Sequence, residues 1–402
     1  MDMAKPIIRF KGYQDDWEQR KLGELAEIVG GGTPSTSVDS YWDGDIDWYA
    51  PAEIGEQIYL KSSQRKITEE GLNKSSAKVL PVGTVLFTSR AGIGKTAILL
   101  KEGCTNQGFQ SIVPNKDKLD SYFIFTRSEE LKRYGEIVGA GSTFVEVSGK
   151  QMANMELMMP TTMDEQQKIG GYFSNLDNLI TLHQRKCDET KRLKKYMLQK
   201  MFPQNGEKVP EIRFSGFTDD WEQRKVCNIT TSYSGGTPKS GYTEYYDGDI
   251  PFIRSGEIYS DKTELFITEL GMKNSSAKMV HEGDILYALY GATSGEVSRA
   301  KLDGAINQAI LAIVPNDDIN ANFLVEWFRK EKDKITDTYL QGGQGNLSAQ
   351  IIKELEVTIP SYDEQNKIGL YFEQLNTLIT LHQRELENLQ NIKKFMLGKM
   401  FV

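Results

Sequence analysis

The sequence predicts an α+β protein made of two tandem copies of one domain, separated by two long helices that pair as an antiparallel coiled coil. The first observation behind this prediction is an internal repeat, because residues 6–21 return with few changes as residues 210–225. The second is a long segment of helical periodicity that closes each copy, over residues 162–200 and 361–399. The predicted parts are a first domain over 1–160, a helix over 161–203, a second domain over 204–360 and a helix over 361–402.

Within each domain, short motifs recur in the same order. Gly-Gly-Thr-Pro begins at Gly31 and Gly235, Asp-Gly-Asp-Ile at Asp43 and Asp247, Ser-Ser-Ala-Lys at Ser75 and Ser275, and Asn-Gln at Asn106 and Asn307. Short β-rich runs, such as 46–50 and 84–88, alternate with polar turns and with a helical pattern over 122–137. Two copies are too few for a solenoid, so we expect two equivalent mixed α+β domains.

The two long helices have clear start signals. Thr162 with Glu165, and Ser361 with Glu364, have the spacing of a capping box. Each helix would run for about 39 residues, or roughly 58 Å. Apolar residues at steps of three and four predict the coiled-coil seam, which comprises Ile169, Phe173, Leu176, Ile180, His183, Ile368, Phe372, Leu375, Ile379, His382, Leu386 and Leu389. Antiparallel pairing would return the end of the second helix to the first domain, so that Trp17 follows it in space as Trp221 follows the first helix in sequence.

Composition limits the classes of function. The chain has 402 residues, 39% hydrophobic and 26% charged, with a formal net charge of −8. This acidic balance argues against a protein that simply coats nucleic acid, so DNA contacts would be local or shared with a partner. Three isolated cysteines show no metal spacing. The absence of a signal sequence and of a long apolar run predicts a cytoplasmic protein without a membrane association.

The ordered motifs resemble those of one family. Asp-Trp-Glu-Gln-Arg-Lys at residues 16–21, the four recurring motifs and the Asp-Glu-Gln helix ending in Lys-Met-Phe, all doubled, resemble the specificity subunit of type I restriction-modification systems. The resemblance implies that each globular part is a target-recognition domain for half of a bipartite double-stranded DNA site. It implies that the helices space these domains and dock two modification (methyltransferase) subunits. Restriction subunits, acting as ATP-dependent translocases and nucleases, would complete the complex.

The same resemblance implies that this chain is not itself an enzyme and carries no cofactor. S-adenosylmethionine, ATP and magnesium are expected on the partner subunits. Two other hypotheses stay open from the residues alone. A metal-dependent nuclease could use the repeated acidic residues Asp43, Asp45 and Glu53 with their counterparts, although Asp-Gly-Asp is also ordinary turn chemistry. A coiled-coil adaptor would not bind DNA at all.

One further motif has two interpretations. Gly92-Ile93-Gly94-Lys95-Thr96 resembles the end of a phosphate-binding loop, but Ser89 stands where the first glycine of that loop belongs. A turn between strands is the alternative interpretation.

Comparing the two copies suggests which residues contact DNA. If the domains recognise different half-sites, shared polar residues serve the scaffold or the phosphates, whereas differing ones contact bases. Thr33, Lys78, Thr237 and Lys278 are therefore the phosphate candidates. The base-readout candidates are Arg90 and its counterpart Tyr290, Lys95 and its counterpart Glu296, and Arg254, whose counterpart is Ala50. Arginine suits a guanine edge, and glutamate can accept a hydrogen bond from cytosine.

Overall fold

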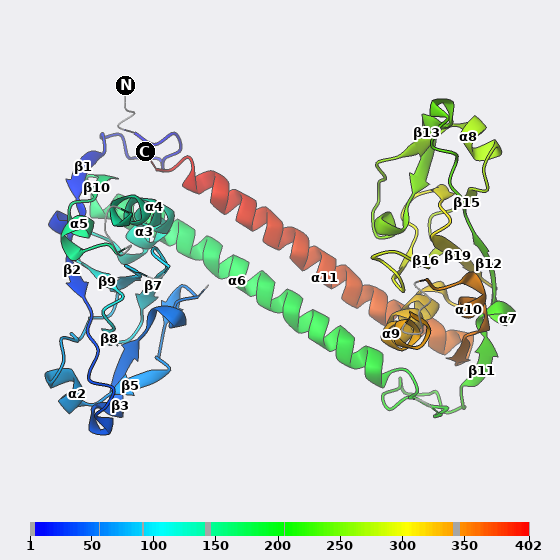
Figure 1. Cartoon of the computed structure of the whole chain (residues 1–402), viewed down its shortest axis with the longest axis horizontal. Coiled ribbons are helices and arrows are strands. Elements are labelled where there is room, and N and C mark those ends of the chain that lie inside the picture. Colours follow the sequence, from blue (N-terminus) through cyan, green and yellow to red (C-terminus); the bar gives the residue numbers. More distant parts are fainter. Residues whose placement is uncertain are drawn as a thin grey trace. The chain divides into compact units, whose positions relative to one another are not determined.

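The computed structural model describes residues 5–55, 57–90, 92–140, 146–204, 206–340 and 346–401. The chain divides into two compact units, one comprising Met1–His183 with Glu385–Val402 and the other Gln184–Arg384. Two long helices, α6 (Met163–Lys200) and α11 (Tyr362–Leu397), pass from one unit into the other (Figure 1). Each unit therefore holds one domain, the start of the helix that follows this domain, and the end of the other helix. The predicted fold class, two tandem α+β domains with two long helices, is confirmed.

The described residues of the first unit form three sheets. Their strand orders are β2-β9-β6-β7-β4, β5-β3-β8 and β1-β10. The strands are β1 (Glu18–Lys21), β2 (Ala26–Gly30), β3 (Trp42–Tyr49), β4 (Tyr59–Leu60), β5 (Arg65–Ile67), β6 (Val85–Phe87), β7 (Thr96–Leu99), β8 (Cys104–Thr105), β9 (Gln110–Pro114) and β10 (Glu156–Met159). The helices before α6 are α1 (Leu22–Leu25), α2 (Glu69–Asn73), α3 (Ser121–Thr126), α4 (Ser128–Gly139) and α5 (Gly149–Ala153), with 3-10 turns η1 (Asp39–Tyr41) and η2 (Pro51–Glu53).

The second unit repeats this plan with one change in each main sheet. Its orders are β12-β19-β16-β17, β14-β13-β18-β15 and β11-β20. The strands are β11 (Glu222–Lys225), β12 (Thr230–Ser234), β13 (Tyr246–Ile253), β14 (Phe266–Ile267), β15 (Lys278–Val280), β16 (Ile285–Ala288), β17 (Val297–Arg299), β18 (Gly304–Ile306), β19 (Ile310–Pro315) and β20 (Glu356–Ile359). The shorter helices are α7 (Val226–Ile229), α8 (Glu269–Lys273), α9 (Ala321–Leu340) and α10 (Ala349–Glu354), with η3 (Thr243–Tyr245) and η4 (Ser255–Glu257). None of the helices in the described ranges is both long and apolar enough to cross a membrane.

The helix predicted over 122–137 is split in the first copy into two helices, α3 and α4. The equivalent segment of the second copy forms one helix, α9. Between α3 and α4, Arg127 leaves the helical conformation, with φ −93° and ψ 17°. Its buried guanidinium donates to the carbonyl oxygen of Met158 at 2.7 Å and pairs with Glu130. Trp327 takes this position in the second copy, where α9 is continuous. The prediction of a single helix is therefore wrong for the first domain, because one buried arginine requires a backbone partner.

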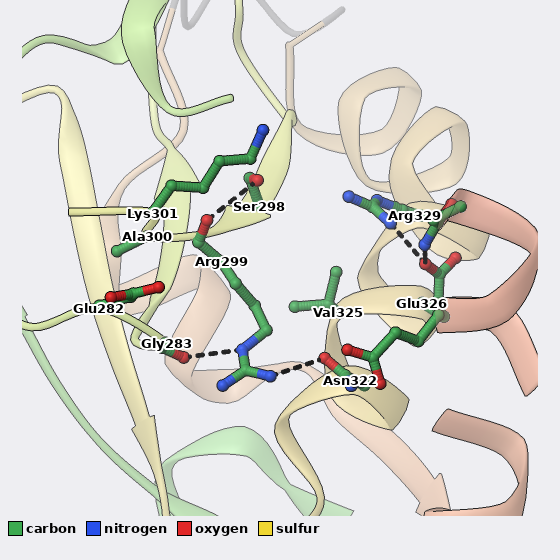
Figure 2. Close-up of a pocket in the computed structure, with 12 residues that line it drawn as sticks. Glu282, Gly283, Ser298, Arg299, Ala300, Lys301, Asn322, Val325, Glu326 and Arg329 are labelled. Atoms are coloured by element: carbon green, nitrogen blue, oxygen red, sulfur yellow. Dashed lines mark hydrogen bonds and ion pairs between the residues drawn. The ribbon is translucent and has the colours of Figure 1, made fainter. Parts of the chain in front are cut away.

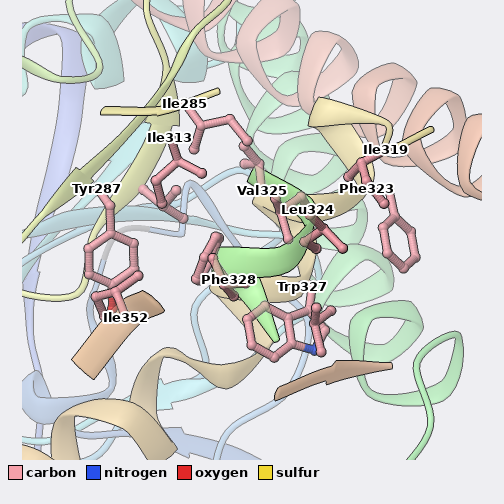
Figure 3. Packing of buried hydrophobic residues seen from close by; sticks show 14 of the residues in the cluster. Ile285, Tyr287, Ile313, Ile319, Phe323, Leu324, Val325, Trp327, Phe328 and Ile352 are labelled. Carbon is pink, nitrogen blue, oxygen red and sulfur yellow. The ribbon is translucent and has the colours of Figure 1, made fainter. Parts of the chain in front are cut away.

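The largest group of buried residues in the second unit lies between the sheet β12-β19-β16-β17 and α9. Tyr287 and Ile313 of the sheet face Phe328 of the helix (Figure 3), whereas Phe323 of the same helix packs against Phe202 and Trp221. The rings of Tyr287 and Phe328 pack edge to face with centroids 5.2 Å apart. Such aromatic pairs add stabilisation beyond the area they bury, so this sheet and helix form a rigid base for the loops at the sheet's edge.

Both tryptophans of the repeated N-terminal motif are core residues that receive the end of a long helix. In the first unit, Trp17 packs against Phe401, with ring centroids 6.2 Å apart, and in the second Trp221 packs against Phe202 at 6.1 Å. The N–H of Ile8 donates to the carbonyl oxygen of Lys399 at 2.9 Å in the first unit. This confirms the prediction that the second helix brings the C-terminus back to the first domain, where the two terminal segments lie side by side (Figure 1).

The predicted capping boxes are only half correct. Thr162 does accept a hydrogen bond from the N–H of Glu165, at 3.3 Å. The carboxylate of Glu165, however, does not return to the helix start, because it is buried and forms a bidentate pair with Arg9 at 2.6 and 2.8 Å. In the second unit Glu364 binds Arg213 in the same way, at 2.7 and 2.8 Å. Each helix start is thus joined to the segment that precedes β1 or β11.

Inside each unit, the start of one long helix pairs antiparallel with the end of the other. Lys393 approaches Asp177 at 2.6 Å in the first unit, and Lys194 approaches Asn376 at 2.7 Å in the second. Asp177 to Lys194 and Asn376 to Lys393 are the same step of 17 residues in the sequence, so one antiparallel register accounts for both pairs.

The seam residues differ in burial along the helices. Buried members are Ile169, Phe173, Leu176, Ile368, Phe372, Leu375 and Leu389, whereas Ile180, His183, Ile379, His382 and Leu386 are partly exposed. The buried members also belong to the cores of the units, so the helix ends are continuous with the domains.

Candidate nucleic-acid interface

Three repeated motifs that are far apart in the sequence meet at one edge of the first unit. The N–H of Gly32 donates to the carbonyl oxygen of Thr105 at 2.8 Å, which places Gly-Gly-Thr-Pro beside Asn-Gln. A Cβ atom at Gly31 would clash with the carbonyl oxygen of Asn106, and one at Gly32 would clash with the backbone nitrogen of Ala77. Only glycine permits this approach of three backbone segments, which explains the Gly-Gly pair.

The second unit builds the same junction. Gly236 donates to the carbonyl oxygen of Ile306 at 3.2 Å, and a Cβ atom on Gly236 would clash with the hydroxyl of Ser276. The loops after β2 and β12, the loops after β8 and β18, and the segments that lead to Lys78 and to Lys278 at the start of β15 therefore form one cluster in each unit, which we call the loop edge.

The phosphate candidates lie at this loop edge. The hydroxyl of Thr33 donates to the side-chain oxygen of Gln107, and that of Thr237 donates to Gln308 in the same way. Lys78 and Lys278 follow the Ser-Ser-Ala segments and are exposed. Within the described residues, neither lysine lies within ion-pair distance of a carboxylate. Both amines are consequently available to a phosphate, whereas the threonines also hold the Asn-Gln loop.

Arg90 and Tyr290 occupy equivalent places beside that cluster. Ser89 N–H donates to the carbonyl oxygen of Gly108, and Leu289 N–H donates to that of Ala309, so each candidate follows a residue bound to the Asn-Gln loop. Arg90 is partly exposed and lies 4.0 Å from Glu146. Burial raises the pKa of Tyr290, and a hydrogen bond with Gln308 opposes this effect. The side chain of Tyr290 thus contacts the loop edge through Gln308, whereas that of Arg90 lies near Glu146.

Arg254 is engaged by acidic neighbours. Its guanidinium donates to Glu257 at 2.9 and 3.1 Å and to Glu264 at 2.7 Å. These hydrogen bonds raise the pKa of Arg254 above its usual range. Burial disfavours the charged form of Glu257, but hydrogen bonds from Arg254 and from two backbone N–H groups outweigh this and lower its pKa to about 2. A bidentate base contact through Nε and Nη2, the atoms that bind these carboxylates, would require Arg254 to release at least one of them.

Lys95 and Glu296 lie in the hairpin turns before β7 and β17. The backbone of Lys95 is bonded on both sides to Thr88, and Gly92 and Gly94 have positive φ values of 102° and 96°. Because β7 rather than a helix follows, Gly92–Thr96 forms a strand turn and not a phosphate-binding loop. Glu296 accepts hydrogen bonds from Lys332 and Tyr259, which lower its pKa against the effect of burial. The neighbours of Arg90 and Tyr290 are bonded to the Asn-Gln loop, whereas Lys95 is bonded to Thr88, and Glu296 to Lys332 and Tyr259.

The acidic residues of the nuclease hypothesis do not come together. Among the described residues, no group of three His, Cys, Asp or Glu side chains is arranged to hold a metal ion. Asp43 and Asp247 lie in β3 and β13, where each strand shifts its register, with φ values of 59° and 58°. Glu53 accepts backbone hydrogen bonds from Ala50 at 2.9 Å and Gln64 at 2.7 Å. The repeated glutamate is therefore a loop support.

Sequence comparison missed several residues that shape these sites. Gln107 and Gln308 were recognisable as repeated, but their bonds to the threonines depend on chain folding. Arg65 lies over the ring of Trp42 with its guanidinium carbon 3.7 Å from the centroid. This cation–π contact has no sequence signal, because the two residues lie on different strands.

Comparison with known proteins identifies the family. The family model described as "Type I restriction modification DNA specificity domain" matches residues 14–192 and 218–391. The chain belongs to the type I restriction-modification specificity subunits. Similar relatives include the type I restriction enzyme MjaIX specificity subunit of Methanocaldococcus jannaschii, 30% identical over 70% of this chain and 68% of the relative.

A second relative from that organism, a putative MjaX specificity subunit, is 23% identical over 94% of this chain and 91% of its own. The crystal structure of the S subunit from M. genitalium is similar with a TM-score of 0.70 and 15% identity, covering 99% of both chains. That likeness shows a shared fold. In this specificity subunit, the two matched segments coincide with the two copies that carry the loop edges.

Proposed function

We propose that each unit of this specificity subunit recognises one half of a bipartite double-stranded DNA site through its loop edge. The proposal rests on one observation, which is that the two loop edges share the same backbone junction but carry different side chains beside it. Both copies have the Thr–Gln hydrogen bond and an exposed lysine, yet Arg90 corresponds to Tyr290 and Ala50 to Arg254. A common frame suits phosphates, which carry no sequence information, and the differing residues suit base edges.

The contacts divide accordingly. Lys78, Lys278, Thr33 and Thr237 would position the backbone, and their loss would weaken binding to all sequences. Arg90 and Arg254 have the donors for a guanine edge in the major groove. Tyr290, Lys95 and Glu296 complete the candidates for base readout. Glu296 would accept from a cytosine amine only after releasing Lys332 or Tyr259, so its role depends on rearrangement at the DNA.

The complex extends beyond this chain. The long helices are proposed to dock two modification subunits and to space the two units, and restriction subunits would join the full assembly in the cytoplasm. We place S-adenosylmethionine, ATP and magnesium on those partners, and we assign no catalytic step to this chain. Support comes from the family and from the two long helices, which pass from one domain to the next.

A domain exchange tests the proposal. Residues 23–158 would be replaced by the equivalent region of a specificity subunit with another target, and the DNA modified by the assembled complex would be sequenced. We expect one half of the methylated sequence to change and the other to stay. The reciprocal exchange of the second domain is the matched control. Changes in both halves, or DNA cleavage by the isolated chain with magnesium, would contradict the proposal.

A further inference from the structure

A groove of about 550 Å³ lies inside the second unit, beside β17 (Figure 2). One wall is β17 and the residues after it, where Arg299 and Lys301 lie. The other wall comprises Asn322, Val325, Glu326 and Arg329 of α9, together with Glu373 and Asn376 of α11. Ser298 and Arg299 of β17 border this groove, whereas the carbonyl oxygen of Val297 accepts a hydrogen bond from Arg329 at 3.3 Å.

The first unit fills the equivalent place with its own chain. There, β4 pairs parallel with β7, the strand equivalent to β17, with Tyr59 opposite Ile98. The N–H of Ile98 donates to the carbonyl oxygen of Ile58 at 2.7 Å, and that of Leu100 donates to Leu60 at 2.9 Å. The ring of Tyr59 packs against Tyr122 of α3, with centroids 6.1 Å apart. A short strand therefore closes the sheet and covers the adjoining helix.

The second copy lacks the residues that would form this strand. The carboxylate of Glu53 binds the N–H of Gln64, 11 residues later, and that of Glu257 binds the N–H of Glu264, 7 residues later. These two bonds are equivalent, so the second copy is four residues shorter between them. Its sheet ends at β17, whereas the sheet of the first copy continues to β4.

The edge of β17 is oriented to accept a strand. Ala300 exchanges backbone hydrogen bonds with the β16 side, donating to Asp284 at 2.7 Å and accepting from Gly283 at 2.9 Å. In an antiparallel pair, neighbouring residues face alternate sides. The backbone groups of Arg299 and Lys301 therefore point into the groove, as those of Ile98 and Leu100 point toward β4.

The side chains at this place also differ in polarity between the two copies. Arg299, Lys301 and Asn322 stand where the first copy has Ile98, Leu100 and Tyr122. Arg299 donates to the side-chain oxygen of Asn322 at 3.0 Å and to the carbonyl oxygen of Gly283 at 2.9 Å, both neutral acceptors. Within the described part of the chain, no carboxylate lies within ion-pair distance of Arg299 or Lys301. Glu282, Glu326 and Glu373 also line the groove, but Glu326 pairs with Lys194 and Arg329, and Glu373 accepts a hydrogen bond from Asn322. Arg299 therefore stays open to a further carboxylate from a bound segment.

We propose that the groove beside β17 binds an extended segment of a partner polypeptide, which pairs parallel to β17 and directs an aspartate or glutamate toward Arg299. The geometry is the one that the chain itself uses for β4. Strand addition to an exposed sheet edge is an established mode of peptide recognition, in which backbone bonds supply affinity and alternate side chains supply specificity. This proposal is independent of the DNA-recognition role.

Peptides derived from the first copy test the proposal on the intact chain. One probe has the sequence of residues 55–62, and the second carries Glu in place of Tyr59. We expect the Glu peptide to bind at least tenfold more tightly by fluorescence anisotropy, and to slow hydrogen exchange at the amides of Arg299 and Lys301. A Leu60→Pro version of the Glu peptide, which lacks one strand N–H, should bind more weakly and protect neither amide.

Variants of the groove provide the matched controls. Arg299→Ile restores the residue of the first copy and should reverse the preference toward the Tyr peptide. Insertion of Gln-Ile-Tyr-Leu after Ser260 should supply a strand in cis, protect the two amides and abolish peptide binding, whereas Gly-Ser-Gly-Ser at the same place should not protect them. Equal binding of both peptides would overturn the proposal. So would protection of the amides by a DNA duplex alone, or unprotected amides with every peptide and with the inserted strand.

Discussion

At the scale of single residues, the repeated glutamate after the third strand of each domain is used in two ways. Among the described residues, the carboxylate of Glu53 accepts hydrogen bonds from the backbone of its loop, whereas that of Glu257 also binds the guanidinium of Arg254. Each carboxylate braces the connection to the next strand of its sheet, from β3 to β5 in the first copy and from β13 to β14 in the second. The second copy adds a charged side chain to this support, and its availability to DNA depends on that pair.

Glu257→Gln should lower the free energy of unfolding at pH 7 by about 2 kcal/mol, because charge-assisted hydrogen bonds from Arg254 and the backbone are lost. The pKa of Glu257 is lowered to about 2 in the folded chain, from an ordinary value of 4.5. Its stabilising contribution is therefore fully present above about pH 4.5 and is lost as the pH falls toward 2. Urea unfolding across this pH range should show that the difference in free energy of unfolding between the wild type and Glu257→Gln becomes smaller as the pH falls. An undiminished difference at pH 2 to 3 would contradict this.

Arg254→Ala tests base readout in one half-site. If the guanidinium leaves its carboxylates for a guanine edge, the variant should lose about 1–3 kcal/mol of binding and accept other bases at one position. Binding to a library of sites by the assembled complex would measure this. Lys278, a phosphate candidate, provides the matched control. Lys278→Ala should weaken binding to all DNA sequences alike and make this binding less dependent on salt concentration. The same uniform pattern for Arg254→Ala would reassign this residue to phosphate contact.

At the scale of elements, each long helix begins at a buried ion pair. The side chain of Glu165 is 1% exposed and that of Arg9 is 11% exposed, and the hydrogen bonds between them raise the pKa of Arg9. The pair connects residues 156 positions apart. It thereby anchors the segment before β1 to the first turn of α6, where the helix leaves its domain.

Arg9→Ala should destabilise the first unit by about 3–5 kcal/mol, because it leaves a buried carboxylate without its partner. Arg213→Ala should have a similar effect in the second unit, since Arg213 forms the equivalent pair with Glu364. Glu189→Gln, which removes an exposed pair with Arg185, should change stability by less than about 1 kcal/mol. Thermal unfolding of the three variants would compare them. A small effect of Arg9→Ala would mean that water or another group satisfies Glu165.

At the scale of the whole molecule, the ruler hypothesis concerns the distance between half-sites. Two domains that read one side of B-DNA should recognise half-sites centred about 10 base pairs, or roughly 34 to 36 Å, apart, or a multiple of this. The common antiparallel register of the two helix pairs makes a matched change in both helices possible. The spacing can therefore be altered without altering either loop edge.

Adding one heptad after Glu189 and one after Asn388 keeps the seam in phase and lengthens the helices by roughly 10 Å. That corresponds to about three base pairs at roughly 3.4 Å per pair. We expect modification of the same half-sites with a longer gap, at reduced activity because the domains also rotate around the duplex. A folded complex that modifies no site would agree with the hypothesis as well. An unchanged gap with wild-type affinity would leave the helices as a docking surface only.

The sequence by itself determined the duplicated architecture, the two long helices and the family. These follow from signals that are local or simply repeated: heptad spacing, helix start residues and motifs in the same order. It also indicated which positions differ between the copies. Arg90 and Tyr290, and the position of Arg254, indeed lie beside the shared loops, although their roles at DNA stay predictions.

Tertiary structure alone decided how those residues are used. Glu165 has a capping-box spacing, but a distant arginine provides a stronger partner for its buried carboxylate. Arg254 appears as a free base reader in the sequence, yet folding places Glu264 against it. The four-residue difference after Glu257 is visible by counting, but only the sheet order shows that it removes an edge strand and opens a groove. These outcomes depend on contacts between segments far apart in the chain, where periodicity and spacing carry no information.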